Sequence, residues 1–201
     1  MRPEKKIIQT AHTAELAVGF GRKVRNLIGQ DDFQSVFPGI ELSSDSKAAG
    51  RWNTNKRGDY FAIGVGGAVT GKGADILIID DPHSEQEAQL GQYNPDVYDK
   101  VYEWYTSGPR QRLQPGGAII LVMTRWSKRD LTGQLLKVMQ EREGADEWEL
   151  IQLPAIMPSG NPLWGEFWSL PELESLKAEL PVAKWNAQYQ QDPTSEEGAL
   201  I

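Results

Sequence analysis

Two nearly continuous apolar runs constrain the fold of this chain more than any other feature. The first is Ile76–Ile79, which is followed directly by Asp80 and Asp81, and the second is Ala118–Met123, which is followed by Thr124. Runs this apolar are typical of strands that are buried on both faces of a parallel sheet. Segments with helical spacing alternate with the apolar runs. The sequence therefore predicts an α/β fold, a mostly parallel sheet with helices on both faces.

The other expected elements follow from periodicity and turn signals. Within the polar section Gly29–Asn55, Pro38-Gly39 and Ser43-Ser44-Asp45-Ser46 are expected to be loop. After Pro154, proline, glycine and tryptophan become frequent, so residues 154–201 are expected to form an appended arm. Further strands are expected at residues 6–11, 60–65, 75–80 and 147–155, and helices at 13–27, 96–113, 129–140 and 169–180.

Composition excludes several classes of protein. The 201 residues carry 28 acidic and 21 basic side chains, which excludes a uniformly basic nucleic-acid binder but leaves local basic patches open. The absence of cysteine excludes a disulfide framework and a thiolate metal site. The longest apolar run is too short to span a bilayer, and the N-terminus lacks the apolar segment of a signal peptide. A soluble intracellular chain is expected.

Gly66–Lys72 fits G-x-x-x-x-G-K, the spacing of a phosphate-binding loop. Such a loop needs a helix beneath it and a serine or threonine after the lysine to hold magnesium. Here Lys72 is followed by Gly73, and the next expected element is a strand. The segment is therefore interpreted as a glycine-rich connection between two strands, and it is not expected to bind phosphate.

The aspartate pair at the end of the first apolar run suggests a catalytic site. Side chains at the carboxyl end of a parallel strand face the edge where α/β proteins bind ligands. Asp80 could hold a magnesium ion there, and Asp81 could polarise an attacking water. The alternative is a strand that ends in a helix-capping aspartate before Pro82. This motif alone does not decide between the two.

The next strand along the chain favours the catalytic interpretation. It ends in Thr124, Arg125 and Trp126, and it is expected to lie beside the strand of Asp80. A hydroxyl that donates and accepts hydrogen bonds suits contact with a γ-phosphate or its attacking water. Arg125 could instead form a surface ion pair with Asp130, and Trp126 is expected to pack.

The chain also resembles a known family, the large terminase subunit of tailed bacteriophages. The motifs that carry the resemblance occur in order over nearly the whole chain, and they are "AIGVGGAVTGKGADILIIDDP", "LQPGGAIILVMTRWSKRDLTGQLL", "LPAI", "PLWGEFWSLPELESLKAEL" and "WNAQYQQDPTSEEG". Members of that family are similar to a RecA-like P-loop ATPase followed by an RNase H-like nuclease. They pump phage DNA into a procapsid and cut it.

The resemblance implies a role for each candidate residue. Asp80 corresponds to the magnesium-site aspartate, and Asp81 stands where a catalytic glutamate is usual. Thr124, with Arg125 and Trp126, belongs to the motif that couples hydrolysis to DNA movement, and Thr124 is also expected at the nucleotide. Lys72 is the candidate for a trans-acting finger that reaches the nucleotide of a neighbouring subunit, with a solvated loop lysine as the alternative. An ammonium matches phosphoryl oxygens less well than a guanidinium.

The resemblance also implies cofactors, partners and missing parts. The cofactors are ATP and Mg²⁺, and the partners are double-stranded DNA, a portal protein, a small terminase subunit and copies of the chain in a homo-oligomeric ring, in the cytoplasm of a host. Residues 1–153 correspond to a partial ATPase domain, and residues 154–201 to a linker arm. The phosphate loop would precede Met1, and the nuclease would begin after about residue 198, so this chain alone is expected to be inactive.

Two other functions stay open from the sequence. One is a catalytically incomplete chain that acts only as a module for binding subunits or DNA. The other is a stand-alone magnesium phosphoesterase that uses Asp80, Asp81 and His83.

Overall fold

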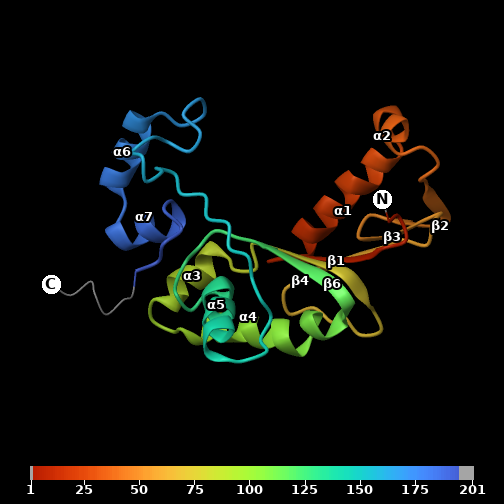
Figure 1. Cartoon of the computed structure of the whole chain (residues 1–201), viewed down its shortest axis with the longest axis horizontal. Helices are drawn as coiled ribbons and strands as arrows, with labels where there is room; N and C mark the ends of the chain where they lie inside the picture. The colour runs from red at the N-terminus through yellow and green to blue at the C-terminus, as the bar shows by residue number, and fades with distance from the viewer. Residues whose placement is uncertain (1, 195–201) are drawn as a thin grey trace. The chain divides into compact units, whose positions relative to one another are not determined.

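The computed structural model describes residues 2–194, which form two compact units (Figure 1). Met1–Glu85 and Lys100–Met123 make up the first, which we call the sheet unit. Gln86–Asp99 and Thr124–Ile201 make up the second, which we call the helical unit. The predicted functional division into 1–153 and 154–201 does not coincide with these units and stays a prediction.

The sheet unit contains one six-stranded sheet in the order β2-β3-β4-β1-β5-β6. Strands β4, β1, β5 and β6 are parallel, whereas β3 runs antiparallel to β4 and β2 antiparallel to β3. The predicted mostly parallel α/β sheet is therefore confirmed. The strands are β1 (Lys6–Ala11), β2 (Leu42–Ala48), β3 (Arg51–Thr54), β4 (Asp59–Gly64), β5 (Ala74–Asp80) and β6 (Leu113–Val122).

The adjacent strands β1 and β5 contribute buried apolar side chains to the core. Ile8 of β1 pairs with Leu77 of β5, and both side chains are almost completely buried. Ile79 is buried in the same way near the end of β5. Burial of side chains of this size contributes roughly 1.5–3 kcal/mol each to stability. This packing fixes the direction and register of the strand that ends in the aspartate pair.

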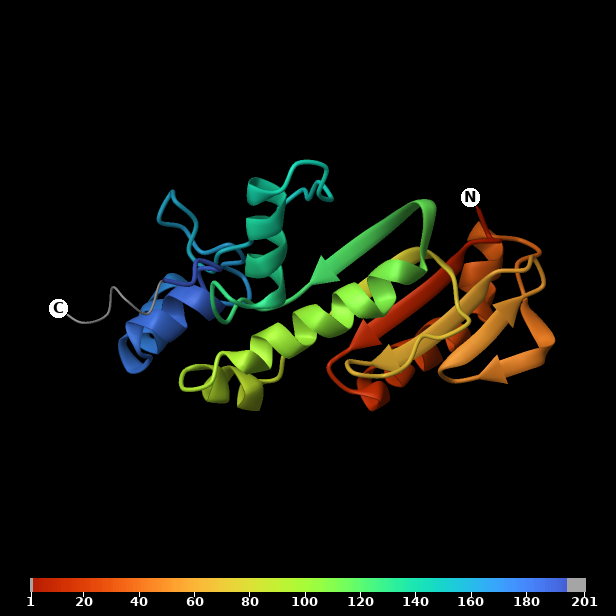
Figure 2. The same cartoon turned by 90° about the horizontal axis from the view of Figure 1, so that it is seen from below.

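Helices cover both faces of this sheet, as predicted (Figure 2). Helix α1 (Ala14–Ile28) lies on one face and buries Ala17, Gly21 and Ile28. On the other face lies α4 (Asp96–Ser107), which begins in the helical unit and continues into the sheet unit, where Val101 and Tyr105 are buried. It ends six residues before the predicted limit of residue 113, and the 3-10 turn η1 (Pro109–Arg112) follows it.

Pro38-Gly39 lies in a turn, as expected, whereas the expectation of loop at Ser43–Ser46 was wrong. The surrounding polar section Gly29–Asn55 contains regular elements. It contains the short helix α2 (Asp31–Val36) and the strands β2 and β3. The Trp52 ring of β3 stacks on Tyr60 of β4, with centroids 4.7 Å apart, and the indole Nε1 donates to the Gly21 carbonyl oxygen. Tertiary packing of one tryptophan, rather than local periodicity, holds these polar strands in the sheet.

The helical unit consists of short helices joined by long connections. They are α3 (Glu85–Gly91, whose first residue belongs to the sheet unit), α5 (Leu131–Glu141), α6 (Leu170–Glu179) and α7 (Val182–Gln188). A capping box between Ser169 and Glu172 starts α6, and the rings of Trp185 and Tyr189 stack 4.9 Å apart. Between residues 2 and 194, no helix has the length and apolar character needed to cross a membrane.

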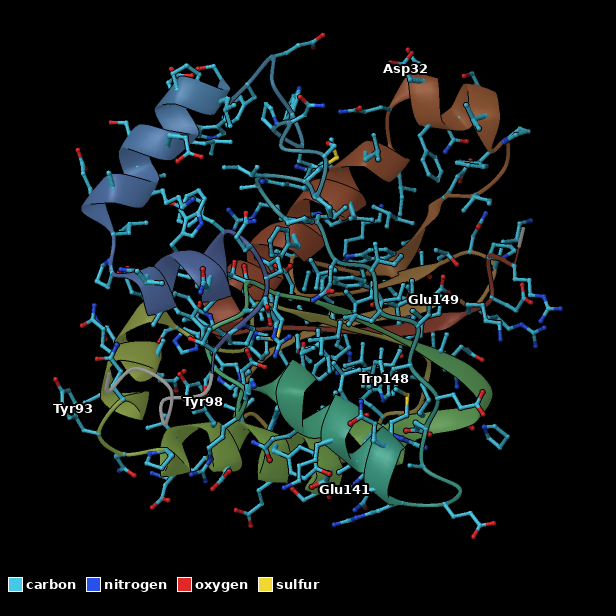
Figure 3. All side chains as sticks on the ribbon, turned by 60° about the vertical axis from the view of Figure 1, so that its left-hand side comes forward. Asp32, Tyr93, Tyr98, Glu141, Trp148 and Glu149 are labelled. Carbon is cyan, nitrogen blue, oxygen red and sulfur yellow. The ribbon has the colours of Figure 1, made fainter. Side chains whose placement is uncertain are left out.

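The predicted strand at residues 147–155 was also wrong. The segment, which carries Trp148 and Glu149 in Figure 3, pairs with no other strand in the described part of the chain. Leu150, Ile151 and Leu153 are all exposed. A strand-like sequence forms a sheet strand only when a neighbouring strand bonds its backbone, and among residues 2–194 no strand pairs with this segment.

Candidate functional site

The four parallel strands end in one row. Ala11, the last residue of β1, pairs with Gly64, the last of β4, and also with Asp80, the last of β5. Asp80 in turn pairs with Val122, the last residue of β6. The strand ends therefore form a straight carboxyl edge, the edge at which open α/β sheets bind ligands.

The N-terminus of α1 lies at this edge. The Thr13 hydroxyl accepts a hydrogen bond from the Leu16 amide at 3.3 Å and caps the helix. Gly64 allows the first turn to approach, because a Cβ at this position would lie 2.5 Å from the Ala14 nitrogen. The 15-residue helix thus directs its positive dipole end toward the carboxyl edge, which favours an anion there.

Asp81 turns the chain out of the sheet directly after β5. Its backbone is left-handed, with φ of 39°, and its amide donates to the Val122 carbonyl oxygen at 2.9 Å. Aspartate tolerates this conformation better than most residues other than glycine. Pro82 and His83 beyond it are buried, whereas Asp81 is exposed. The buried neighbours and the hydrogen bond to Val122 therefore hold the Asp81 backbone in an uncommon conformation, and its carboxylate is exposed.

The neighbouring Asp80 carboxylate is partly buried, and its environment disfavours the charged form. Burial raises the pKa of Asp80 above its ordinary value, and the adjacent negative charge of Asp81 raises it further. A bound cation would relieve both effects.

Asp80→Asn is expected to change the pH dependence of stability. Because the folded pKa is raised, the folded chain binds more protons than the unfolded chain between the ordinary and raised values, so stability falls as pH rises through that window. The variant lacks this penalty and should be more stable than the parent at neutral pH, with the difference vanishing below about pH 4. Urea titrations at several pH values measure it.

Glu143→Gln is the control, because it removes one negative charge from an exposed position outside the sheet. It should leave the pH dependence unchanged. Equal pH profiles for Asp80→Asn and the parent would show that the carboxylate is not destabilised in the folded state.

The donor set fits magnesium better than a cation that needs a complete protein cage. Within the described residues, no group of three or more His, Asp or Glu side chains could hold a metal ion. Magnesium usually keeps several waters and binds through one or two carboxylates together with substrate phosphates. Asp80 could supply one such ligand. The same observation gives no support to a metal cluster of Asp80, Asp81 and His83, and the His83 side chain is buried.

Lys72 lies at the opposite end of the sheet. As predicted, Gly66–Lys72 connects two strands, and β5 rather than a helix follows it. The Lys72 ammonium pairs with Asp59, the first residue of β4, at 3.0 Å and lies 5.3 Å from the centre of the Phe61 ring. Because β5 spans about 20 Å, the structure does not bring Lys72 together with Asp80. A role in a neighbouring subunit stays a prediction, and it would require this ion pair to open.

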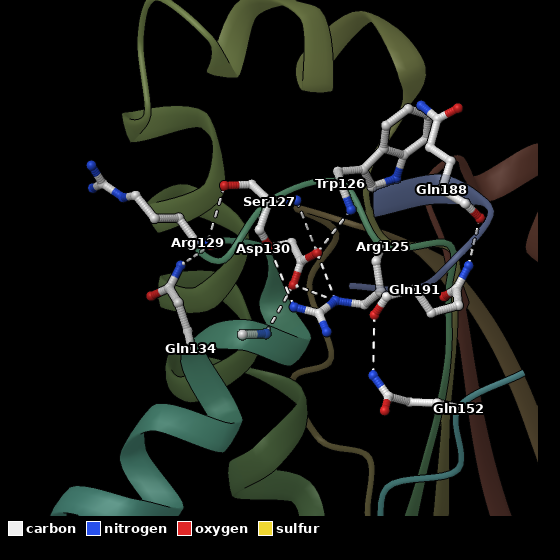
Figure 4. Close-up of polar contacts among 10 residues, drawn as sticks. Arg125, Trp126, Ser127, Arg129, Asp130, Gln134, Gln152, Gln188 and Gln191 are labelled. Atoms are coloured by element: carbon white, nitrogen blue, oxygen red, sulfur yellow. Dashed lines mark hydrogen bonds and ion pairs between the residues drawn. The ribbon is translucent and has the colours of Figure 1, made fainter. Parts of the chain in front are cut away.

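Thr124 follows the last residue of β6 by two positions and begins the loop that leads to α5. This loop belongs to the helical unit, whose placement against the sheet unit is not described. Hydrogen bonds among residues of the helical unit hold the conformation of this loop (Figure 4). The nucleotide-contacting role of Thr124 therefore remains a prediction from the register of β6 beside β5.

Asp130 holds the loop after Thr124. Its carboxylate is completely buried and accepts hydrogen bonds from the Arg125 guanidinium at 3.0 and 3.2 Å and from the amides of Trp126, Ser127 and Gly133 at 2.9, 3.2 and 2.8 Å (Figure 4). It is also the N-cap of α5. The loop and the helix therefore share one carboxylate as their common acceptor.

Arg125 forms the ion pair with Asp130 that was the alternative to a catalytic role, but the pair is buried and does not lie at the surface as expected. The residue is buried, and its NH2 group also donates to the Ser127 carbonyl oxygen at 3.4 Å. The sequence indicated this pair but not the importance of Asp130. An aspartate directly before the apolar periodicity of α5 was the available signal, because aspartate is a preferred N-cap.

Comparison with solved structures finds proteins that are similar to this chain. The crystal structure of the HK97 bacteriophage large terminase matches 92% of this chain, with a TM-score of 0.49 and 14% sequence identity, and the chain spans 39% of the length of that protein. No family model and no curated protein sequence matches. The structural similarity transfers no residue role to this chain.

Proposed function

We propose that this chain is part of a viral terminase large subunit, the ATP-driven motor that packages DNA, and that it supplies the acidic strand of the ATPase site. The observation that carries the proposal is the aspartate pair at the end of a central parallel strand. Asp80 is the proposed magnesium ligand, and Asp81 orients the attacking water. The α1 N-terminus at the same edge supports an anionic ligand there.

The chemistry that this chain contributes is electrostatic. Asp80 would hold a magnesium ion through a carboxylate oxygen, and the bound ion would neutralise charge on the ATP phosphates. The Asp81 carboxylate accepts a hydrogen bond from the water that attacks the γ-phosphate. Thr124 is proposed to contact the γ-phosphate or that water from the neighbouring strand. DNA translocation, cutting and the partners of the motor belong to this proposal as well.

The phosphate loop is the part of the site that this chain does not supply. No strand–loop–helix with the G-x-x-x-x-G-K-[ST] pattern occurs in its sequence. We propose that a neighbouring segment provides the loop, so that the isolated chain binds ATP weakly or undetectably.

The test uses two polypeptides and one ligand. Calorimetric titration of the isolated chain with Mg²⁺-ATP should show little or no binding, because the backbone cradle makes most phosphate contacts. A polypeptide that joins the chain to an upstream coding segment with G-x-x-x-x-G-K-[ST] should bind and hydrolyse ATP. Micromolar binding by the isolated chain would overturn the proposed division, and an inactive joined polypeptide would overturn the ATPase assignment.

The alternative function is a module that only binds subunits or DNA. It predicts that the joined polypeptide binds its partners but does not hydrolyse ATP. Phosphatase or nuclease turnover by the isolated chain with Mg²⁺ alone would instead favour the phosphoesterase.

A further inference from the structure

Basic side chains are concentrated in two segments of the sheet unit. Residues 16–30 and 46–58 carry seven of the 21 Lys and Arg side chains of the chain and none of its 28 Asp and Glu side chains. The chain as a whole has a net charge of −7. Composition therefore does not explain these positive segments, and a surface that carries charge of one sign attracts a partner of the opposite sign.

The fold brings the two segments into contact. Helix α1 lies against the turn that joins β2 to β3, and a Cβ at Gly21 would lie 2.6 Å from the Ala49 carbonyl oxygen (Figure 1). The Arg25 guanidinium of α1 donates to the Lys47 carbonyl oxygen of β2 at 2.9 Å. All of these residues belong to the sheet unit, so contacts inside that unit set their arrangement.

Four cationic side chains surround this turn, and we call Arg22, Arg25, Lys47 and Arg51 the basic surface. Arg22 and Arg25 are three positions apart on α1, so they are neighbours on the helix. Lys47 and Arg51 lie in β2 and β3, on either side of the turn. Arg22, Lys47 and Arg51 are exposed, and Arg25 is partly buried.

The basic surface has no acidic partner. Among residues 2–194, no ion pair includes any of its four members. Asp45 is the acidic residue closest to them in sequence, and its carboxylate accepts a hydrogen bond from the Ser43 hydroxyl at 2.7 Å. Four neighbouring positive charges repel one another, and a bound polyanion would replace this repulsion with attraction.

The chemistry of the basic surface fits the phosphates of a nucleic-acid duplex. Three of the four side chains are arginines, whose planar guanidinium groups match phosphate oxygens. Surfaces that bind single strands also use exposed aromatic rings on which bases stack. The two segments contain only Phe20 and Trp52, of which Trp52 is buried and Phe20 is partly buried. A duplex therefore fits better than a single strand.

An anionic bilayer is the alternative occupant, because α1 also exposes Leu16, Val24 and Leu27. A helix that binds a bilayer carries its cations beside an apolar face that inserts. Here two of the four cations lie on β2 and β3 instead, and the turn between them, Ala48–Gly50, carries no large apolar side chain. The duplex is thus favoured, and vesicles form a separate arm of the test.

We propose that the basic surface binds the phosphate backbone of double-stranded DNA and does not read its base sequence. Contacts to phosphates position a protein on the duplex but carry no sequence information. The choice of DNA among polyanions rests on the proposed function, whereas the contact itself needs neither ATP nor the phosphate loop. In a homo-oligomeric ring, each subunit would present one such surface to the same duplex, so that several weak contacts act together.

The first test measures binding of the full chain to a short labelled duplex by fluorescence anisotropy, without nucleotide. At physiological salt the Kd should be roughly 10⁻⁴–10⁻⁶ M. Four neutralised phosphates should give a slope of log K against log salt of about −3.6. Failure to bind the duplex at low salt, or binding to phosphatidylserine vesicles in its place, would overturn the proposal. Loss of ATP hydrolysis in the joined polypeptide with duplex binding retained would contradict the ATPase assignment alone.

Arg22→Ala combined with Arg51→Ala removes two exposed cations whose side chains form no hydrogen bond or ion pair within residues 2–194. The slope should fall to about −1.8, and affinity at about 50 mM salt should fall by roughly 10²-fold. Lys137→Ala combined with Lys177→Ala is the matched control, because it removes the same charge from exposed positions of the helical unit. Parental binding by the first variant, or an equal loss in the control, would refute the assigned surface.

A single fluorophore locates the contact without removing any charge. The chain contains no cysteine, so Ala48→Cys, at an exposed position at the end of β2, can be labelled alone. Addition of the duplex should change the emission of an environment-sensitive label there. The same label at Ala178→Cys, an exposed position in α6, should not respond. No response at position 48, or an equal response at both positions, would overturn the placement of the DNA.

Discussion

Asp81→Asn is expected to reduce ATP hydrolysis by about 10²- to 10⁴-fold in a polypeptide that joins this chain to its phosphate loop, the range that a positioned general base contributes. Asparagine has the shape of aspartate and tolerates the left-handed φ of 39° at this position, so the fold should not change. The amide cannot accept a proton from the attacking water. Steady-state hydrolysis and nucleotide binding should therefore separate, with kcat lost and affinity for ATP largely retained.

Strand β5 itself offers the matched control. Asp75 lies at its opposite end, where its carboxylate pairs with Lys5 at 2.8 Å. Asp75→Asn makes the same chemical change on the same strand, about 20 Å from the proposed site, and should leave kcat unchanged. Hydrolysis at the parental rate by Asp81→Asn, or equal losses in both variants, would contradict the catalytic assignment.

Asp130→Ala is expected to destabilise the helical unit by about 3–5 kcal/mol, the cost of removing one partner of a buried ion pair. The substitution leaves the buried Arg125 guanidinium without its carboxylate and removes the N-cap of α5. Three backbone amides lose their acceptor at the same time. Urea unfolding followed by far-ultraviolet circular dichroism measures the loss.

An exposed ion pair in the same unit provides the comparison. Arg129 and Asp99 are 2.7 Å apart, but both side chains are about half exposed. Asp99→Ala should therefore cost only about 0–1 kcal/mol. Asp130→Asn should fall between the two alanine variants, because an amide oxygen can still cap the helix. If Asp130→Ala costs no more than Asp99→Ala, the buried carboxylate does not hold the loop.

The Asp130 network also bears on the candidate role of Arg125. Its guanidinium already contacts Asp130 and the Ser127 carbonyl oxygen inside the helical unit. To contact a phosphate, Arg125 would have to use the N–H groups that these two contacts leave over, or the loop would have to rearrange and release the guanidinium. We therefore expect Arg125 to act on Thr124 through the shape of the loop, and its direct contact with nucleotide stays a prediction.

The apolar runs were enough to predict the part of the sheet that carries the site. Runs that are apolar at every position, such as Ile76–Ile79, are stable as strands when both faces are covered, and the polar residues after such strands then lie at the carboxyl edge. Predictions from local sequence patterns failed for segments whose structure depends on packing or pairing with another strand. Strand β3 depends on the stacking of Trp52 against Tyr60, and residues 147–155 lack a partner strand despite a strand-like sequence.

The sequence by itself determined which strands are central and parallel and which residues follow them, because long uncharged runs are stable only when buried between layers. Only the tertiary structure decided the rest. The pairing of Ala11 with both Gly64 and Asp80 aligns the strand ends, the connection after β4 leaves Lys72 at the opposite end of the sheet, and Asp130 gathers the loop after Thr124. Contacts between residues distant in sequence set these positions, and no local pattern encodes them.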